Sequence, residues 1–261
     1  MTARSKTAAA LLLLAVLWAG RPVSGATLES LCDPGYPAAA AMESLVEEAE
    51  AAGMTEETLK RLLVVGYRNA DATQTLRRLI CAVVVAEESG LPPGLLFGTL
   101  EEGLGKRVPI DRILDVVRDK IADLEFSRGL VEVDGRHAVD DPLVERVARV
   151  LSLGVSRDEV RGLFAGSPGA PVEMRVVAAE VLGYGRALGM PGDLLDEVVS
   201  TGLAMRAFTP DWSHFVEVVA AARKRGVEDR TTAETAVAVL LENGTLDEWI
   251  GELGIEEREL R

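Results

Sequence analysis

Histidine, cysteine and aromatic residues are all scarce in this chain of 261 residues. It has two histidines, two cysteines and eleven aromatic residues, which are three Trp, three Tyr and five Phe. Sites that pair a nucleophile with a base often use histidine, and zinc sites are built from clustered histidine and cysteine. His137 and His214 are far apart in the sequence, His137 has no Ser or Cys motif nearby, and no CxxC spacing occurs. These shortages argue against a redox, zinc or histidine-dependent site.

Sequence motifs that bind phosphate or metal are also missing. There is no HExxH, EF-hand or GxSxG pattern. The run Gly103-Leu104-Gly105-Lys106-Arg107 is not a phosphate loop, because Leu100 occupies the position of its first glycine and no Ser or Thr follows the lysine. Adjacent carboxylates such as Glu101 and Glu102 point about 100° apart on a helix. We therefore expect no catalytic residue, no metal and no cofactor.

Only one long apolar run occurs, and it lies at the N-terminus. Arg4 and Lys6 precede thirteen residues from Ala8 to Gly20, and Ser24-Gly25-Ala26 then offers a small-x-small cleavage pattern. This arrangement is typical of a signal peptide over residues 1–26. The run is shorter than the roughly 20 apolar residues that span a membrane. We expect a periplasmic or extracellular protein without stable membrane insertion; an uncleaved signal anchor is the alternative.

The chain is strongly acidic, with a formal net charge of −14. The first 26 residues hold three basic residues and no acidic one, so the remainder carries −17. An anionic surface repels nucleic-acid backbones and acidic lipid headgroups, so we expect no nucleic-acid partner. The charge is explained either by solubility or by a basic partner.

Cys32 and Cys81 are the only cysteines, and we expect them to form a disulfide in an oxidising compartment. Such a bond would close a loop of about 50 residues and stabilise the fold by about 4 kcal/mol on the chain-entropy model. A buried free thiol at Cys81 is the alternative.

Hydrophobic residues recur at helical spacing almost everywhere, and no stretch alternates with the period of a strand, so the predicted fold class is all-α. Two such stripes of predicted core residues are Leu59, Leu62, Leu63, Leu76, Leu79, Ile80 and Val83, and Ile113, Leu114, Val117, Ile121 and Leu124.

Parts of the helical pattern occur twice in the sequence, about 100 residues apart. The segment Gly90–Leu96 resembles Gly189–Leu195, 99 positions later, and the break that begins at Gly53 resembles the break at Gly154, 101 positions later. Each break offers a glycine to end one helix and a hydroxyl residue two positions on to cap the next, and Ser156 with Glu159 forms a capping-box pattern. The repetition predicts a tandem duplication.

The predicted organisation is a signal peptide (1–26), a first helical module (37–137), a second module (138–240) and a capping helix or tail (241–261), with a linker at 128–141. Tandem helix pairs predict an α-solenoid-like stack, and two separate bundles are the alternative. The signature residues of tetratricopeptide and ankyrin repeats are absent.

The segment from Phe208 to Phe215 concentrates three aromatic residues and a histidine in eight positions. Thr209 is expected to cap a helix that Pro210 opens, and Phe215 to enter the core. Phe208, Trp212 and His214 are the candidate partner-binding residues, with Trp212 and His214 facing outward or into a groove. The alternative is an aromatic plug at a helix junction.

Together these features favour an exported, non-enzymatic protein that binds a protein, peptide or polymer. Two alternatives stay open: a hydrolase of envelope polymers in which separate carboxylates converge, and a carrier of a small apolar ligand.

Overall fold

The structure, a computed structural model, describes residues 32, 38–67, 70–92, 94–132 and 141–260. The predicted signal peptide and His137 lie outside these ranges, as does most of the predicted linker. Within them the chain forms helices and no strand, which confirms the all-α fold class. None of these helices is both long enough and apolar enough to cross a membrane.

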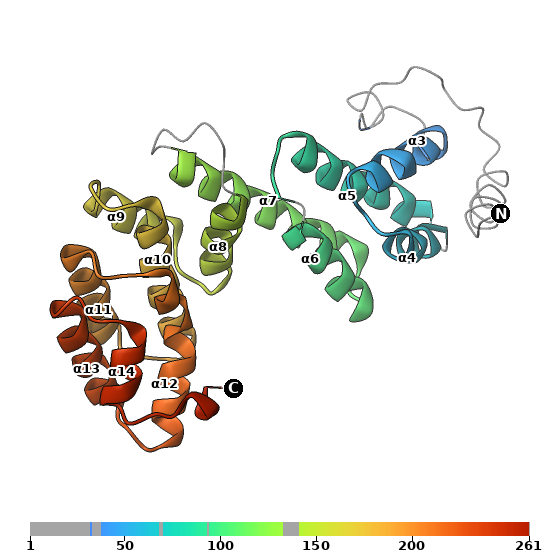
Figure 1. Ribbon diagram of the computed structural model, residues 1–261. Coiled ribbons are helices and arrows are strands. Elements are labelled where there is room, and N and C mark those ends of the chain that lie inside the picture. The colour runs from blue at the N-terminus through green and yellow to red at the C-terminus, as the bar shows by residue number, and fades with distance from the viewer. Residues whose placement is uncertain (1–31, 33–37, 68–69, 93, 133–140, 261) are drawn as a thin grey trace, which may run out of the picture. The chain divides into compact units, whose positions relative to one another are not determined.

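The helices fall into two compact units, which divide between Ala122 and Asp123. The first contains α3 (Ala38–Ala51), α4 (Glu56–Tyr67), α5 (Ala70–Glu88), α6 (Gly94–Gly105) and most of α7 (Ile110–Glu132). The second contains α8 (Asp141–Ser152), α9 (Arg157–Gly166), α10 (Val172–Ala187), α11 (Gly192–Met205), η1 (Pro210–His214), α12 (Phe215–Lys224), α13 (Asp229–Leu241), α14 (Leu246–Glu252) and η2 (Glu257–Glu259). Figure 1 shows the helices, coloured from blue at α3 to red at the C-terminal end.

Helix α5 organises the first unit, because both α3 and α4 pack against it. Its inward face carries Leu76, Leu79, Ile80 and Val83, all within 1% of full burial, which confirms the predicted stripe on this helix. Cys81 on α5 lies at bonding distance from Cys32, with their Cα atoms 5.8 Å apart. The predicted pairing of the two cysteines is therefore confirmed, and it fixes residue 32 to the unit's central helix.

Helix α10 has the same role in the second unit, where α8, α9, α11 and α12 pack around it. Its apolar residues are buried on nearly all sides, and two glycines permit close packing. A Cβ added to Gly185 would lie 2.3 Å from Leu195 Cδ2 on α11, and one added to Gly183 would lie 3.1 Å from Val150 Cγ1 on α8. Buried Glu180 on α10 also accepts two hydrogen bonds from Arg146 on α8. These contacts make α10 a rigid centre for its neighbours.

Several predicted helix ends are confirmed. Gly53 and Gly154 both have left-handed φ angles, of 92° and 90°. Ser156 and Glu159 form the predicted capping box, in which Ser156 Oγ accepts from the Glu159 amide and the Glu159 carboxylate accepts from the Ser156 amide. Local sequence chemistry thus sets where these helices start and stop.

Two local expectations are wrong. Residues 128–132 of the predicted linker form the last part of α7, where Arg128 and Glu132 pair one turn apart. Thr209 makes no side-chain capping bond, although Pro210 does open η1 as expected. A turn of 3-10 helix replaces the expected α-helical start.

The bounds of the helices recur with the spacing found in the sequence. Helices α3 and α8 end 101 positions apart, at Ala51 and Ser152, and α5 and α10 end 99 positions apart, at Glu88 and Ala187. Arg107 and Arg206, 99 positions apart, both have left-handed φ angles, of 57° and 55°. The tandem duplication and the solenoid arrangement stay predictions, which this recurrence favours.

Candidate binding groove

The aromatic segment predicted to bind a partner lies in the core instead. Trp212 is completely buried and stacks on Trp249 of α14, with ring centroids 5.4 Å apart. Phe208 meets the edge of Trp212 at 5.6 Å, and Phe215 stacks on Trp249 at 5.1 Å. The expectation that Trp212 faces outward or into a groove is therefore wrong, because α14 folds over it. The alternative interpretation, an aromatic plug at a helix junction, describes this cluster.

His214 is the only member of the predicted site that faces solvent, with 66% of its side chain exposed. Its Nδ1 lies 3.5 Å from Glu217 Oε1, one turn along the chain. Phe208, like Trp212, is buried. The three predicted residues thus do not present a common surface, and a role for them in partner binding stays untested.

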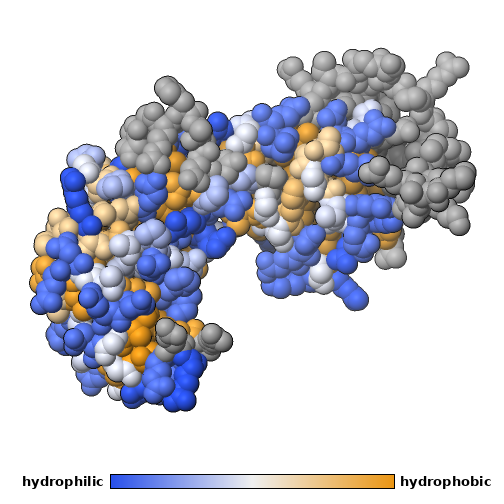
Figure 2. Space-filling model, viewed as in Figure 1, coloured by the Kyte–Doolittle hydropathy of each residue, from blue (hydrophilic) through white to orange (hydrophobic). Residues whose placement is uncertain are grey.

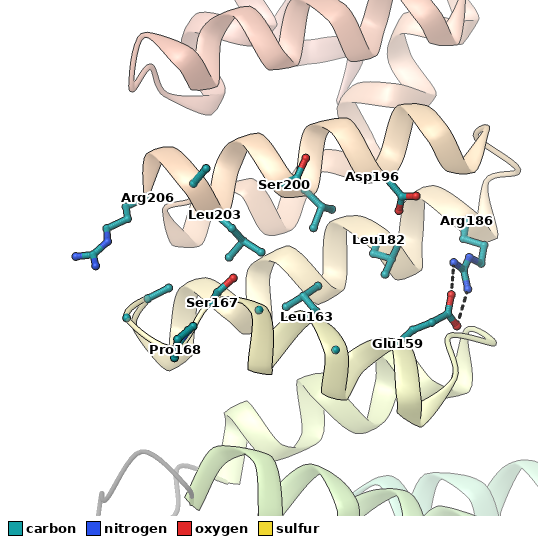
Figure 3. A pocket seen from close by; sticks show the side chains of 16 residues that line it. Glu159, Leu163, Ser167, Pro168, Leu182, Arg186, Asp196, Ser200, Leu203 and Arg206 are labelled. Atoms are coloured by element: carbon teal, nitrogen blue, oxygen red, sulfur yellow. Dashed lines mark hydrogen bonds and ion pairs between the residues drawn. The ribbon is translucent and has the colours of Figure 1, made fainter.

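An open groove lies elsewhere in the second unit, between α9 and α11 and over α10 (Figure 3). Its volume is about 590 Å³, which is within the range of binding sites in proteins. Leu182 and Val199 form a buried floor, and the half-buried Leu163 and Leu203 form the sides. Ser167 to Ala170, the loop between α9 and α10, line one end.

Two glycines on α9 help to keep the groove open. Gly162 and Gly166 both line it, and a Cβ added to either would meet no atom within 4 Å. Gly162 lies in the interior of α9, where glycine costs about 1 kcal/mol relative to alanine, and Gly166 is the last residue of the helix; the four-residue spacing places both on one face. Their spacing within a helical pattern is a signal that sequence reasoning overlooked.

An ion pair marks one end of the groove. Arg186 on α10 donates to both carboxylate oxygens of Glu159 on α9, at 2.7 and 3.2 Å. Hydrogen bonds from Arg186 and from Ser156 lower the pKa of Glu159 to about 2, so this carboxylate is ionised at neutral pH. Asp196 on α11 lies beside the pair and, with Glu159, raises the pKa of Arg186. The end therefore carries two negative charges and one positive charge.

Arg206 marks the opposite end. It follows the last residue of α11 in a left-handed conformation, and the amide of Ala207 donates to Gly202 O at 2.9 Å to close the helix. A Cβ added to Gly169 would lie 3.0 Å from Arg206 Nη2, so the guanidinium lies against the loop after α9. Within the described ranges it forms no hydrogen bond or ion pair.

The outer surface is mostly hydrophilic on the face shown in Figure 2, with hydrophobic residues between the charged ones. Six large apolar side chains are exposed among the described residues: Val64, Val85, Val108 and Val116 in the first unit, and Met205 and Leu241 in the second. No group of three or more His, Cys, Asp or Glu side chains among the described residues is arranged to hold a metal ion. The groove is accordingly the main candidate site.

Comparisons of the chain with protein-family models, with curated proteins and with solved structures give no match. The function must therefore be argued from the chemistry of the groove.

Proposed function

We propose that this protein is an exported, non-enzymatic binding protein that holds a peptide segment of a partner protein in the groove between α9 and α11. The observation that carries the proposal is an open apolar groove with charged groups near both ends. Apolar floors provide affinity, and a few fixed polar groups provide orientation and specificity. A chain segment, with an apolar body and charged side chains, has both kinds of group.

The helices that form the groove are well supported, which suits a binding role. Both α9 and α11 pack on α10, and α11 also packs on α13. The aromatic cluster of Trp212, Trp249 and Phe215 fixes η1, α12 and α14 to the same unit. A site built on rigid helices loses little conformational entropy when it binds.

The groove fits the two alternative functions less well. Glu159 and Asp196 are its two carboxylates, and a glycosidase-type mechanism needs one carboxyl group with a raised pKa to act as the acid. The pKa of Glu159 is instead lowered to about 2. A carrier of an apolar ligand would enclose it, whereas this groove is open and has charges near both ends.

Export is supported by the N-terminal sequence pattern and by the paired cysteines. Disulfides persist in oxidising compartments and are rare in the cytosol. The acidic surface is compatible with a basic partner.

The proposal can be tested by selecting peptides from a displayed library of random octapeptides on the wild-type protein and on two variants. Ser200→Trp places a large ring in the groove, because Ser200 lines it. Glu197→Trp is the matched control, since Glu197 is exposed on the same helix and does not line the groove. We expect peptides that bind the wild type and Glu197→Trp but not Ser200→Trp. The proposal would be overturned if the library yielded no binder, or if the selected peptides bound Ser200→Trp as well as the wild type.

A further inference from the structure

The length of the groove limits what it can hold. Asp196, Ser200, Leu203 and Arg206 follow one another along the groove side of α11 (Figure 3). At about 1.5 Å per residue, the ten steps from Asp196 to Arg206 span about 15 Å. An extended chain rises about 3.3 Å per residue, so this distance matches about five residues of a bound peptide.

The two ends differ in charge. At one end, Arg186 is hydrogen-bonded to Glu159 and also interacts electrostatically with Asp196, so that two carboxylates share one guanidinium and the end carries a net charge of −1. At the other end, the guanidinium of Arg206 lies against Gly169 without a carboxylate partner among the described residues. These four are the only charged side chains that line the groove. The groove is thus neutral as a whole but polarised along its length.

Arg206 has a left-handed backbone conformation, with a φ angle of 55°. A left-handed helix end normally favours glycine, and a residue with a side chain adopts that conformation at a cost. Arg107 occupies the corresponding end of α6 with a similar φ angle of 57°, but its exposed side chain does not line the groove. The two arginines therefore share their conformation and differ in their surroundings, which makes Arg107 a matched control.

We infer that the groove selects an extended peptide segment with a basic side chain at one end, beside Asp196, and a carboxylate about four residues away, on Arg206. This inference rests on the proposed function. Apolar side chains between the two charges contact Leu163 and Leu203. A segment with two like charges at this spacing places one of them against a group of the same sign and is disfavoured.

The test uses three fluorescein-labelled peptides with blocked ends: Lys-Leu-Ser-Val-Glu, Lys-Leu-Ser-Val-Lys and Glu-Leu-Ser-Val-Glu. Their affinities for the full secreted protein are measured by fluorescence anisotropy. We expect the Lys…Glu peptide to bind about fivefold more tightly than either like-charged peptide, since a partly exposed ion pair contributes up to a factor of about five. Arg206→Glu should reverse the preference, so that the Lys…Lys peptide binds best. Arg107→Glu changes the net charge equally and should leave the preference as in the wild type.

Each result has one meaning. A reversed preference in Arg206→Glu alone supports the inference. Equal binding of the three peptides to the wild type, abolished by Ser200→Trp, would overturn the charge selection but leave the groove as a peptide site. The same change of preference in Arg107→Glu as in Arg206→Glu would also overturn the inference, because net charge would explain it. Absence of binding by all three peptides would overturn the inference, whereas failure of the random library is what overturns the proposed function.

Discussion

The region between α4 and α6 in the first unit and the groove between α9 and α11 in the second lie about 100 residues apart in the sequence and differ in their contacts. In the first unit, Thr58 Oγ1 donates to Glu101 Oε1 at 3.1 Å, which joins α4 to α6. The positions about 100 residues later are Glu159 and Ser200, and both line the open groove. The helix pair of the first unit is thus bridged by a hydrogen bond, whereas the helix pair of the second lies beside an open groove.

Three further positions show the same contrast. Phe97 covers the turn before α4, where a Cβ on Gly53 would lie 3.7 Å from its ring, whereas a Cβ on Gly154 would meet nothing within 4 Å. The residue 99 positions after Phe97 is Asp196. Leu62 is completely buried, and Leu163, 101 positions later, is half-buried. Under the predicted duplication, a few side-chain differences would account for the groove of the second unit.

The largest effect is expected from Trp212→Ala, which removes the centre of the aromatic cluster of the second unit. Truncating a fully buried tryptophan leaves a cavity and should lower the free energy of unfolding by about 4 kcal/mol. Arg112, 100 positions earlier, is exposed, and Arg112→Ala should change the free energy by less than about 0.5 kcal/mol. Urea denaturation followed by circular dichroism measures both. Similar stabilities for Trp212→Ala and the wild type would contradict the core role of this residue.

Replacing both Cys32 and Cys81 by serine should destabilise the first unit by about 3 kcal/mol, because the bond constrains a long loop in the unfolded chain; the value is below that of the chain-entropy model since unfolded chains retain residual structure. Amide hydrogen exchange measured for individual residues shows which helices the loss of the disulfide destabilises. Amides of α5 should exchange faster, while those of α10 should be unchanged. Equal acceleration in both helices would show that the two units unfold together.

Gly103 and Gly202 lie 99 positions apart, and each packs closely against a side chain of its own unit. Alanine at each position tests how far that side chain can move. A Cβ at residue 202 would lie 2.3 Å from the Phe208 ring, and one at residue 103 would lie 2.8 Å from Ile113 Cγ1. An aromatic ring can shift less than an aliphatic side chain to make room for a methyl group. We therefore expect the free energy of unfolding to fall by about 2 kcal/mol in Gly202→Ala and by about 1 kcal/mol in Gly103→Ala. Thermal unfolding of the two variants gives the order. The reverse order would show that the Phe208 ring moves freely.

Asp196→Phe should make the groove resemble the first unit, by giving residue 196 the ring that Phe97 supplies there. Peptides selected on the wild type should bind this variant about tenfold more weakly, equivalent to about 1.4 kcal/mol. The exposed position should leave the thermal stability within about 0.5 kcal/mol of the wild type. Unchanged peptide affinity would place the binding surface elsewhere.

The smallest effect is expected from Glu159, which has no ionisable counterpart at Thr58 in the first unit. Its pKa is lowered from 4.5 to about 2 in the folded protein, so the stabilisation by Arg186 is present above pH 4.5 and is lost as the pH falls towards 2. Because the pair is partly exposed, the contribution is less than about 1 kcal/mol. Glu159→Gln should reduce the change in the free energy of unfolding between pH 4.5 and pH 2. If the free energy of unfolding of Glu159→Gln changed with pH as in the wild type, this pH dependence would arise from other carboxylates.

Local sequence patterns predicted the parts of the fold that depend on local physics. The helices follow from hydrophobic periodicity, and the helix ends at Gly53, Gly154 and Ser156 follow from backbone freedom and capping chemistry. The pairing of Cys32 with Cys81 followed from their being the only two cysteines.

The groove could not be predicted in this way, because it depends on which helix face a neighbour covers. Periodicity placed Trp212 on a helix but could not show that α14 packs over it. Glu159, Arg186 and Asp196 come from three helices, and their meeting depends on how α9 and α11 pack on α10. The sequence by itself determined the helical class, the helix ends and the cysteine pair, since these arise from interactions that local spacing or composition specifies. Only the tertiary structure decided that the aromatic segment is core and that a polarised groove stays open, because burial and convergence are properties of packed helices.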